Sequence, residues 1–443
     1  MTNILSDAKR GVEYGVSLGA SQVEICTINR SQIRVEVRNS HVIGSDILEV
    51  SGAGVRVYVD GSLGVASTTR LTELKGAIEK AYHLAKGAPA DPHFKSLPPP
   101  SKYGSVEGLY DKKLAVLTFE ELTERFMEGV EAASPESGFV VSGGLMRDVG
   151  EGAVVNSLGV EALRRETTVT GSIGSKVERD GDTGLGREPI IGRSLGEFNP
   201  IEAGSKAAEK ACSHLGAKKV MTGTMDVILD FRTARNSIGG VLGLGANGLN
   251  VALGTSFLSD KMGAQVASPN LSVVDDPYTP GGMNSRPFDD EGTPSTRVEI
   301  VEKGVLKSFI TDSYSAGRLG IPNTGHARRF ALTSKPVPSL TNIHVASGSW
   351  KLEDLISGTE RGVLLEDSGL GPSGVSTNIS SMVDFGFYVE KGDVVHPVKN
   401  TMIGTTVFDF LANIDAVTKE TLKEGGSTSP ALRVTKVRVA GGL

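Results

Sequence analysis

The sequence has few of the features that mark secreted, membrane-spanning or nucleic-acid-binding proteins. Its two cysteines, Cys26 and Cys212, form no CxxC motif, so neither a disulfide framework nor a zinc knuckle is supported and a reducing cytoplasm is the expected location. No run of about 18 apolar residues occurs, which argues against a membrane-spanning helix. The net charge of -6 is opposite in sign to what a phosphate backbone attracts, so we expect no direct binding to nucleic acid.

Catalytic motifs are scarce as well. The seven histidines occur singly and without an HExxH motif, whereas a zinc catalyst needs about three protein ligands. No GxSxG nucleophile elbow is present. Residues 243–248 match the GxGxxG pattern, but the preceding strand-like run ends near Leu229, and Gln265 occupies the position of the acidic residue that would hold a ribose. We therefore interpret this segment as a flexible glycine-rich stretch.

The patterns that are present predict an α+β protein with several domains. A chain of 443 residues with 39% hydrophobic and 22% charged residues is expected to form about two or three domains. We place one helix-strands-helix unit at residues 1–87, a second at 104–216, and a β-rich domain at 220–443. The two similar units suggest an internal structural duplication, and the prolines of residues 87–103 predict a stiff extended connection between them.

Both N-terminal units alternate between helical and strand periodicity. Helices are predicted over 4–20 and 71–86 in the first unit, where Asp60 and Gly61 favour a hairpin turn. In the second unit, Thr118 and Glu121 form a capping box that begins a helix, and another helix is predicted near 201–215. The strand-like runs lie at residues 23–26, 33–37, 55–59, 139–142, 153–156 and 167–170.

The C-terminal half is rich in glycine and in short β-branched runs, which favours a sheet with few helices. One helix is predicted over 407–414, because apolar residues recur there at helical spacing. Residues 432–439 alternate in the strand period and predict a last strand that closes the sheet. Further strands are predicted at residues 225–229, 298–301 and 362–365.

The acidic trio Asp289, Asp290 and Glu291 has two interpretations. Neighbouring carboxylates can act in acid and base catalysis or bind a hard metal ion. Consecutive side chains on an extended strand point to opposite faces, however, so three in a row converge on one ion only at a tight turn. We favour a structural role, in which these carboxylates pair with Arg286, Arg297 or backbone amides in a buried loop.

Several segments, taken in order along the chain, resemble the PmbA/TldD family. These proteins were once called gyrase modulators and are understood as subunits of a cytosolic metallopeptidase. The resemblance covers nearly the whole chain, and the segments that carry it are residues 57–64, 275–292, 323–325 and 389–399.

The resemblance also predicts the absence of a zinc centre. Active members carry HExxxH on a helix soon after a strand similar to residues 227–229, with a C-terminal cysteine as a further zinc ligand. Gly239 and Gly240 stand where the first His and the Glu belong, Leu244 stands at the second His, and residues 425–430 contain no cysteine. Such positions can neither bind zinc nor activate a metal-bound water. We therefore expect no cofactor and no catalytic residue, as in the PmbA branch, also called TldE.

The role implied by the resemblance is that of a non-catalytic subunit in a peptidase complex that acts on small or unfolded peptides. Its partner would be a homologous, metal-bearing TldD-type subunit, or the chain itself as a homodimer. A stand-alone homodimeric peptide-binding or adaptor protein is the alternative, and a non-metallo hydrolase or nucleotide-dependent enzyme is a third possibility.

Candidate contacts to substrate or partner are concentrated in one loop and the acidic trio. The loop offers small residues, amide donors and a cationic clamp for a carboxylate, although it could equally serve only to pin two strands together. The cationic neighbours of its histidine disfavour a bound metal. The candidates are Asn323, Thr324, Gly325, His326, Arg328, Asp289, Asp290 and Glu291.

Overall fold

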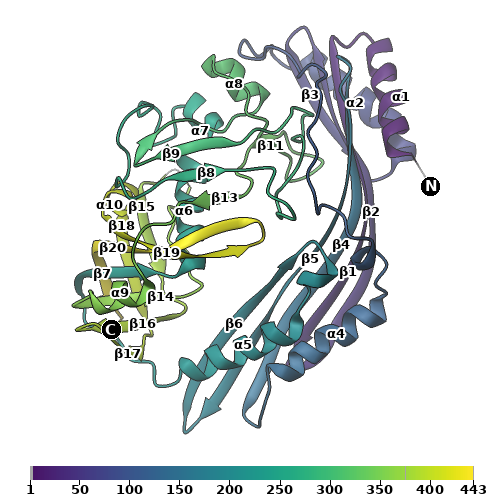
Figure 1. Ribbon diagram of the computed structural model, residues 1–443. Helices are drawn as coiled ribbons and strands as arrows, with labels where there is room; N and C mark the ends of the chain where they lie inside the picture. Colours follow the sequence, from purple (N-terminus) through teal and green to yellow (C-terminus); the bar gives the residue numbers. More distant parts are fainter. Residues whose placement is uncertain (1–2, 375, 443) are drawn as a thin grey trace.

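The computed structural model describes residues 3–374 and 376–442. A six-stranded sheet comes from the N-terminal half of the chain and a twelve-stranded sheet from the C-terminal half. The C-terminal part lies against one side of the long, curved N-terminal sheet (Figure 1). The predicted α+β fold with a strand-rich C-terminal region is confirmed. Among the described residues, no helix is both long and apolar enough to cross a membrane.

The two predicted N-terminal units share a single sheet. Its strands are antiparallel in the order β3-β2-β1-β4-β5-β6, and the units join where β1 pairs with β4. The elements are α1 (Ile4–Ser17), β1 (Gln22–Arg38), β2 (His41–Val59), β3 (Ser62–Thr68), η1 (Leu71–Glu73), α2 (Leu74–Gly87), α3 (Lys112–Ala115), α4 (Phe119–Ala132), β4 (Phe139–Asn156), β5 (Glu161–Arg179), β6 (Asp182–Gly192), η2 (Leu195–Glu197) and α5 (Pro200–Ser213).

The local turn and cap signals of the N-terminal half are confirmed. Asp60 and Gly61 both adopt positive φ values, 49° and 82°, in the turn between β2 and β3, as a two-residue hairpin requires. The hydroxyl of Thr118 accepts the Glu121 N–H at 3.2 Å, and the Glu121 carboxylate accepts the Thr118 N–H at 2.9 Å. Both signals depend on neighbouring residues alone, which explains why the sequence suffices to predict them.

The prediction of short, separate strands in this half is wrong. The runs at 23–26 and 33–37 belong to one strand, β1, and those at 139–142 and 153–156 belong to β4. The apolar alternation is interrupted in the middle of β1, where Arg30 donates to Asp148 of β4 at 3.0 Å. The strand therefore continues through a charged residue, because a carboxylate from a distant part of the sequence balances its charge.

The two faces of the N-terminal sheet differ in chemistry. Ile25, Val35 and Ile173 belong to clusters with the apolar sides of the helices that cover one face. Because side chains alternate along a strand, the intervening residues point to the other face. Arg56 and Arg164 lie there and pair with carboxylates of the C-terminal part. The charged face of this sheet therefore forms one wall of the interface between the two parts.

The C-terminal half forms the larger, mixed sheet. Its main path is β10-β9-β8-β13-β20-β7-β14-β16-β17, and β15, β18 and β19 pair beside it. The elements are β7 (Gly223–Leu229), α6 (Phe231–Gly245), α7 (Gly248–Ala252), β8 (Val273–Asp275), β9 (Val298–Glu302), β10 (Val305–Leu306), α8 (Ser313–Leu319), β11 (Ala327–Arg328), β12 (Val337–Pro338), β13 (Ile343–Val345), α9 (Leu352–Ser357), β14 (Arg361–Leu365), β15 (Asn378–Met382), β16 (Gly386–Glu390), β17 (Asp393–Pro397), β18 (Thr401–Thr406), α10 (Val407–Ala412), β19 (Ile414–Glu424) and β20 (Ser427–Gly441).

Two predictions near the C-terminus need correction. The helix predicted over 407–414 ends at Ala412, and Ile414 instead begins β19, where it pairs with Val434 and is buried. The last strand does not alternate regularly, because its register against β7 shifts between Val434 and Val437, next to Lys436 with a φ of 61°. This bulge shifts the alternation by one residue, so Val434 and Val437 both belong to the C-terminal core.

Candidate functional site

Helix α6 carries the residues that the family resemblance places at the zinc motif. It follows β7 directly, and the Asp230 carboxylate accepts the Thr233 N–H at 2.7 Å to cap its first turn. Gly239 and Leu244 lie on a partly exposed side of the helix, and Gly240 is exposed. A Cβ added at Gly240 would meet nothing within 4 Å, and one at Gly239 would lie 3.2 Å from the Ile343 side chain. Gly240 thus has room for a side chain, but none of these residues offers a metal ligand.

Ion pairs join the C-terminal hairpin to the first turns of α6. Glu424, next to the turn between β19 and β20, accepts from Arg232 Nε at 2.8 Å and from Arg235 Nη1 at 2.7 Å. Arg232 also binds Glu188 of β6, with Nη1 2.9 Å from Oε2. Both carboxylates are therefore held by guanidiniums at the start of the helix and are not free to bind a cation. Within residues 3–374 and 376–442, no group of three or more His, Cys, Asp or Glu side chains is placed to hold a metal ion.

The glycine-rich segment at 243–248 is not a flexible stretch. Gly243 and Gly245 form the last turn of α6, and Gly248 begins α7. The Gly248 N–H, a donor that a phosphate cradle would need, donates instead to the Ile310 carbonyl at 2.8 Å. The prediction of flexibility is therefore wrong, because the segment is largely helical and Ala246, between the glycines, packs into the C-terminal core.

The acidic trio is buried, and its three carboxylates point to different partners. Asp289 accepts the backbone N–H groups of Glu291, Thr293 and Ala327 at 2.9–3.0 Å. Asp290 accepts from Arg164 Nη2 at 2.8 Å and from the Arg329 N–H at 2.7 Å. Glu291 accepts from Arg56 Nη2 at 2.8 Å and from the Ser313 N–H at 2.9 Å. The trio therefore organises a loop rather than one metal or acid-base centre.

The arginines that pair with the trio are not the ones predicted. Arg297 lies 3.7 Å from Asp276, and Arg286 has no carboxylate partner within ion-pair distance among the described residues. The sheet of the N-terminal half supplies Arg56 and Arg164 instead. Pairing across the interface could not be read from neighbours in the sequence.

Burial and neighbouring charges shift the pKa values of Asp289 and Asp290 in opposite directions. Burial, followed by the nearby charge of Glu291, raises the pKa of Asp289 to about 8. Burial alone would also raise the pKa of Asp290, but the Arg164 and Arg286 guanidiniums outweigh it and hold this pKa at about 2. Asp290 is therefore a permanent anion at neutral pH, matched to the cations of the opposite sheet.

A closed ion-pair cluster joins the two halves of the chain. We call Glu24, Arg56, Glu291 and Arg329 the matched cluster. Glu24 binds Arg56 Nε at 2.9 Å and Arg329 Nη2 at 2.5 Å, and Arg56 reaches across to Glu291. The side chains are at most 6% exposed. Two cations thus meet two anions without water access.

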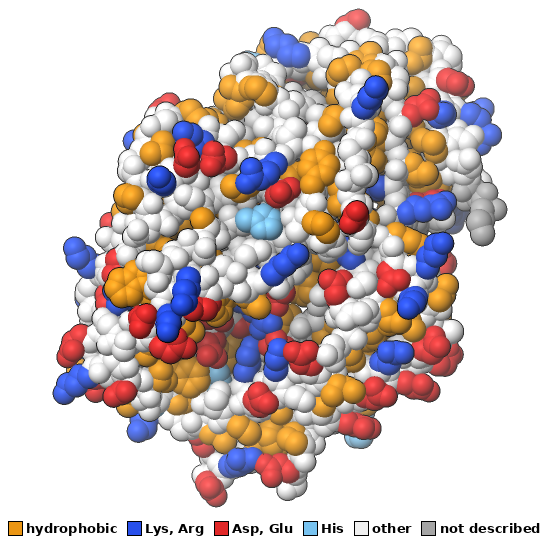
Figure 2. Space-filling model, in the orientation of Figure 1, with side chains coloured by type: hydrophobic (Ala, Val, Ile, Leu, Met, Phe, Trp, Pro, Cys, Tyr) orange, Lys and Arg blue, Asp and Glu red, His pale blue; other side chains and the backbone are white. Residues whose placement is uncertain are grey.

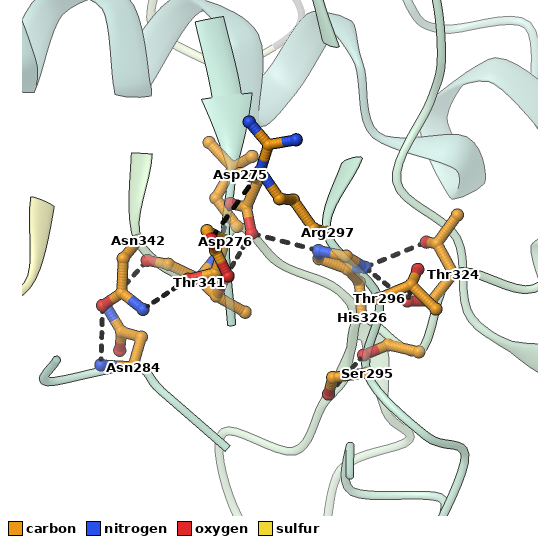
Figure 3. A network of polar contacts seen from close by, with 12 residues as sticks. Asp275, Asp276, Asn284, Ser295, Thr296, Arg297, Thr324, His326, Thr341 and Asn342 are labelled. Carbon is orange, nitrogen blue, oxygen red and sulfur yellow. Dashed lines mark hydrogen bonds and ion pairs between the residues drawn. The ribbon is translucent and has the colours of Figure 1, made fainter. Parts of the chain in front are cut away.

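The predicted contact residue His326 is fully buried. Figure 3 shows its ring between Asp275 and Thr324, with Nε2 3.1 Å from the Asp275 carboxylate and Nδ1 2.9 Å from the Thr324 hydroxyl. The same carboxylate of Asp275 accepts the Thr341 N–H at 2.7 Å. His326 therefore holds the loop onto β8 and has no surface to offer a substrate.

The rest of the loop is occupied by internal hydrogen bonds. The Asn323 side chain donates to Ser313 Oγ at 3.1 Å and accepts the Gly325 N–H at 3.0 Å, and Thr324 bonds with Thr311. Gly325 is buried. Arg328 differs, because its guanidinium is partly exposed and donates to Asn284 Oδ1 at 2.8 Å.

Arg328 lines a polar cavity that sequence reasoning did not predict. This cavity, which we call the arginine cavity, has a volume of about 320 Å³ and lies between the charged face of the N-terminal sheet and the C-terminal part. The only signal in the sequence was the charged alternation Arg164-x-Glu166 within a strand. The lining residues are Arg30, Met146, Asp148, Arg164, Glu166, Thr168, Thr170, Arg193, Met283, Asn284, Ser285, Arg286, Asp290, Arg328 and Arg329.

A second, more apolar cavity of about 650 Å³ lies between the proline-rich connection and helices α7 and α8. Tyr58 stacks on Phe94 in its wall, with ring centroids 3.7 Å apart. Asp312 also lines it, and burial together with the charge of Glu291 raises the pKa of this carboxyl to about 6. Apolar walls with a few polar groups are typical of ligand sites.

Comparisons with known proteins agree over the length of the chain. Family models described as PmbA/TldA metallopeptidase domain 1, central domain and C-terminal domain match residues 23–85, 112–215 and 222–441. Metalloprotease PmbA of Escherichia coli O157:H7 is 25% identical over 437 residues, covering 93% of this chain and 91% of that protein. A metalloprotease PmbA homolog of Haemophilus influenzae is 25% identical and covers 97% and 94%.

The fold also matches a solved structure. TldE from Thermococcus kodakarensis superposes with a TM-score of 0.87 over 98% of this chain and 100% of that chain, at 22% identity. A likeness at this identity shows a common fold.

Proposed function

The chain belongs to the PmbA/TldD family of metallopeptidases, and from this we propose that it is a non-catalytic subunit of a peptidase complex. Its work would be to bind small or unfolded peptides in the cytoplasm. The metal and the hydrolytic step would come from a homologous TldD-type subunit. A homodimeric peptide-binding or adaptor protein is the alternative.

This proposal rests mainly on the residue types that α6 has at the positions of the zinc motif. At the positions that the family resemblance assigns to two His and one Glu, the chain has Gly239, Gly240 and Leu244. A hydrolytic zinc site needs about three protein ligands and a base near the metal-bound water. The nearby carboxylates of Glu188 and Glu424 are paired with Arg232 and Arg235, so they are not free to act as metal ligands. These residues do not fit zinc, so no catalytic step is assigned to this chain.

The open face of α6 supports a role beside a partner. Gly240 leaves space where an active relative would have a side chain. In a complex, the same face would border the cavity in which the active subunit holds its peptide. The chain would then limit access to that cavity without changing the substrate itself.

A mixing experiment tests the proposal. The purified chain, a metal-containing TldD-type homologue, and an equimolar mixture would be assayed for zinc content, for cleavage of an unfolded peptide, and for mass by light scattering. We expect cleavage only where the homologue is present, and a new species of summed mass in the mixture. Stoichiometric zinc and chelator-sensitive cleavage by this chain alone would overturn the proposal, whereas a homodimer that ignores the homologue would favour the adaptor alternative.

A matched pair of variants sharpens this experiment. Gly240→Arg and Gly76→Arg both place a long side chain at an exposed helical glycine whose Cβ would meet nothing within 4 Å. We expect Gly240→Arg to reduce cleavage or assembly in the mixture and Gly76→Arg on α2 to leave both unchanged. Equal behaviour of the two variants would count against α6 as the shared face.

A further inference from the structure

The arginine cavity has more positive than negative groups, although the whole chain has a net charge of -6. Six arginines and three carboxylates line it. On the face drawn in Figure 2, by contrast, basic and acidic side chains are interspersed. The excess of positive groups is therefore local to this partly open cavity, where charges are screened less than on the exposed surface.

The carboxylates in the cavity are already occupied. Asp148 and Glu166 pair with Arg30, and Glu166 also lies 3.6 Å from Arg193. Asp290 pairs with Arg164. Among the described residues, Arg286 and Arg328 have no carboxylate at ion-pair distance, although Asp290 and Asp289 lie close enough to act on Arg286 electrostatically.

Arg286 is the group that most needs a ligand. It is 7% exposed, and its Nε and Nη2 atoms are buried without a hydrogen-bond partner among the described residues. Arg164 Nη1 and Arg329 Nε lack partners in the same way. Burial, together with the charges of Arg164 and Arg328, lowers the pKa of Arg286. A buried guanidinium without acceptors is costly to keep, which a bound anion would relieve.

We propose that the arginine cavity binds the carboxylate of a short peptide, with Arg286 and Arg328 as its ligands. A guanidinium offers paired N–H donors that match the two oxygens of a carboxylate. Met146 and Met283 also line the cavity and give an apolar part of the ligand a surface, which a bare inorganic anion would not use. The volume of about 320 Å³ is at the small end of ligand sites, which suits the last residues of a peptide.

The choice of a peptide as the source of the carboxylate rests on the proposed function. The site itself is a property of this chain alone, so its test needs no partner. If the chain failed to bind the carboxylate, the result of the mixing experiment would still stand. If the chain failed to assemble with a homologue, the measured binding of the carboxylate would still stand.

The test is calorimetric titration of the full chain at low salt with three probes. These are an N-acetylated unstructured hexapeptide with a free C-terminal carboxylate, the same peptide as its C-terminal amide, and inorganic phosphate. We expect the free acid to bind at least about tenfold more tightly than the amide, because truncating a charge-paired group costs that much or more. Equal binding of acid and amide, or binding of phosphate without binding of the acid, would overturn the proposal.

Variants separate a ligand role from a structural one. Arg286→Met should weaken binding of the free acid at least about tenfold and leave the unliganded chain equally or more resistant to heat, since it removes an unpartnered buried cation. Arg165→Met is the control, because Arg165 is exposed and pairs with Glu151 on the other face of β5. Should Arg286→Met fail to fold, the partly exposed Arg328→Met gives the same readout. Unchanged binding in the Arg286 or Arg328 variant would refute the assignment.

Discussion

The interface between the two halves of the chain contains two arginine-rich regions that differ in how their charges are matched. In the matched cluster, Arg56 pairs with Glu24 and Glu291, and Arg329 pairs with Glu24, so each guanidinium has a carboxylate partner. In the arginine cavity, Arg286 keeps two buried nitrogen atoms without partners. Buried arginines thus hold the two halves of the chain together in the matched cluster, whereas in the arginine cavity they offer a site for an anion. Charge balance distinguishes these roles more clearly than burial does.

The largest effect is expected in the matched cluster. Glu24→Gln keeps the shape of the side chain but leaves the guanidiniums of Arg56 and Arg329 short of one buried anion. We expect a loss of about 3–5 kcal/mol in the free energy of unfolding, measured by urea denaturation. A loss below about 1 kcal/mol would show that the cluster contributes little, and the contrast with the arginine cavity would disappear.

An intermediate effect is expected from the pH dependence of Asp290, which belongs to the cavity but is paired. Its pKa is held at about 2 in the folded chain against 3.8 for an ordinary aspartate, so it stabilises the fold above pH 3.8. This contribution, on the order of 2 kcal/mol, is lost as the pH falls from about 4 through 2. Urea denaturation at stepped pH would measure it. The Asp290→Asn variant should show a shallower acid slope, and an identical slope would contradict the pairing.

The smallest effect is expected outside the interface. Arg165 follows Arg164 directly but lies on the other face of β5, where it is 68% exposed and pairs with Glu151 at 3.0 Å. Arg165→Met should change the free energy of unfolding by less than about 1 kcal/mol, because exposed pairs are screened by water. Denaturation beside the Glu24→Gln variant would compare the two directly. A loss as large as that of Glu24→Gln would contradict this expectation. The face of the sheet on which an arginine lies would then not determine how much it contributes to the free energy of unfolding.

The sequence allowed the elements to be located where neighbouring residues determine them. The Thr118 capping box and the Asp60-Gly61 turn both depend on contacts within a few residues. The middle of β1 and the partners of the acidic trio were missed, because Arg30, Arg56 and Arg164 find their carboxylates more than a hundred residues away. Local patterns contain no information on such pairs.

The candidate site divides in the same way. The family resemblance placed Gly239, Gly240 and Leu244 on a helix, and their lack of zinc ligands is a matter of residue type. His326 was expected to face a ligand, but it is buried against Asp275, and only the structure shows that Arg328, partly exposed, lines a cavity with Arg286.

The amino-acid sequence by itself determined the α+β composition, the caps and turns, and the lack of donors on α6, because these follow from side-chain chemistry and short-range geometry. The tertiary structure alone decided which arginines are matched and which are left without an anion. That difference arises because the balance of charge in a buried region is set by strands and loops that meet only when the chain has folded.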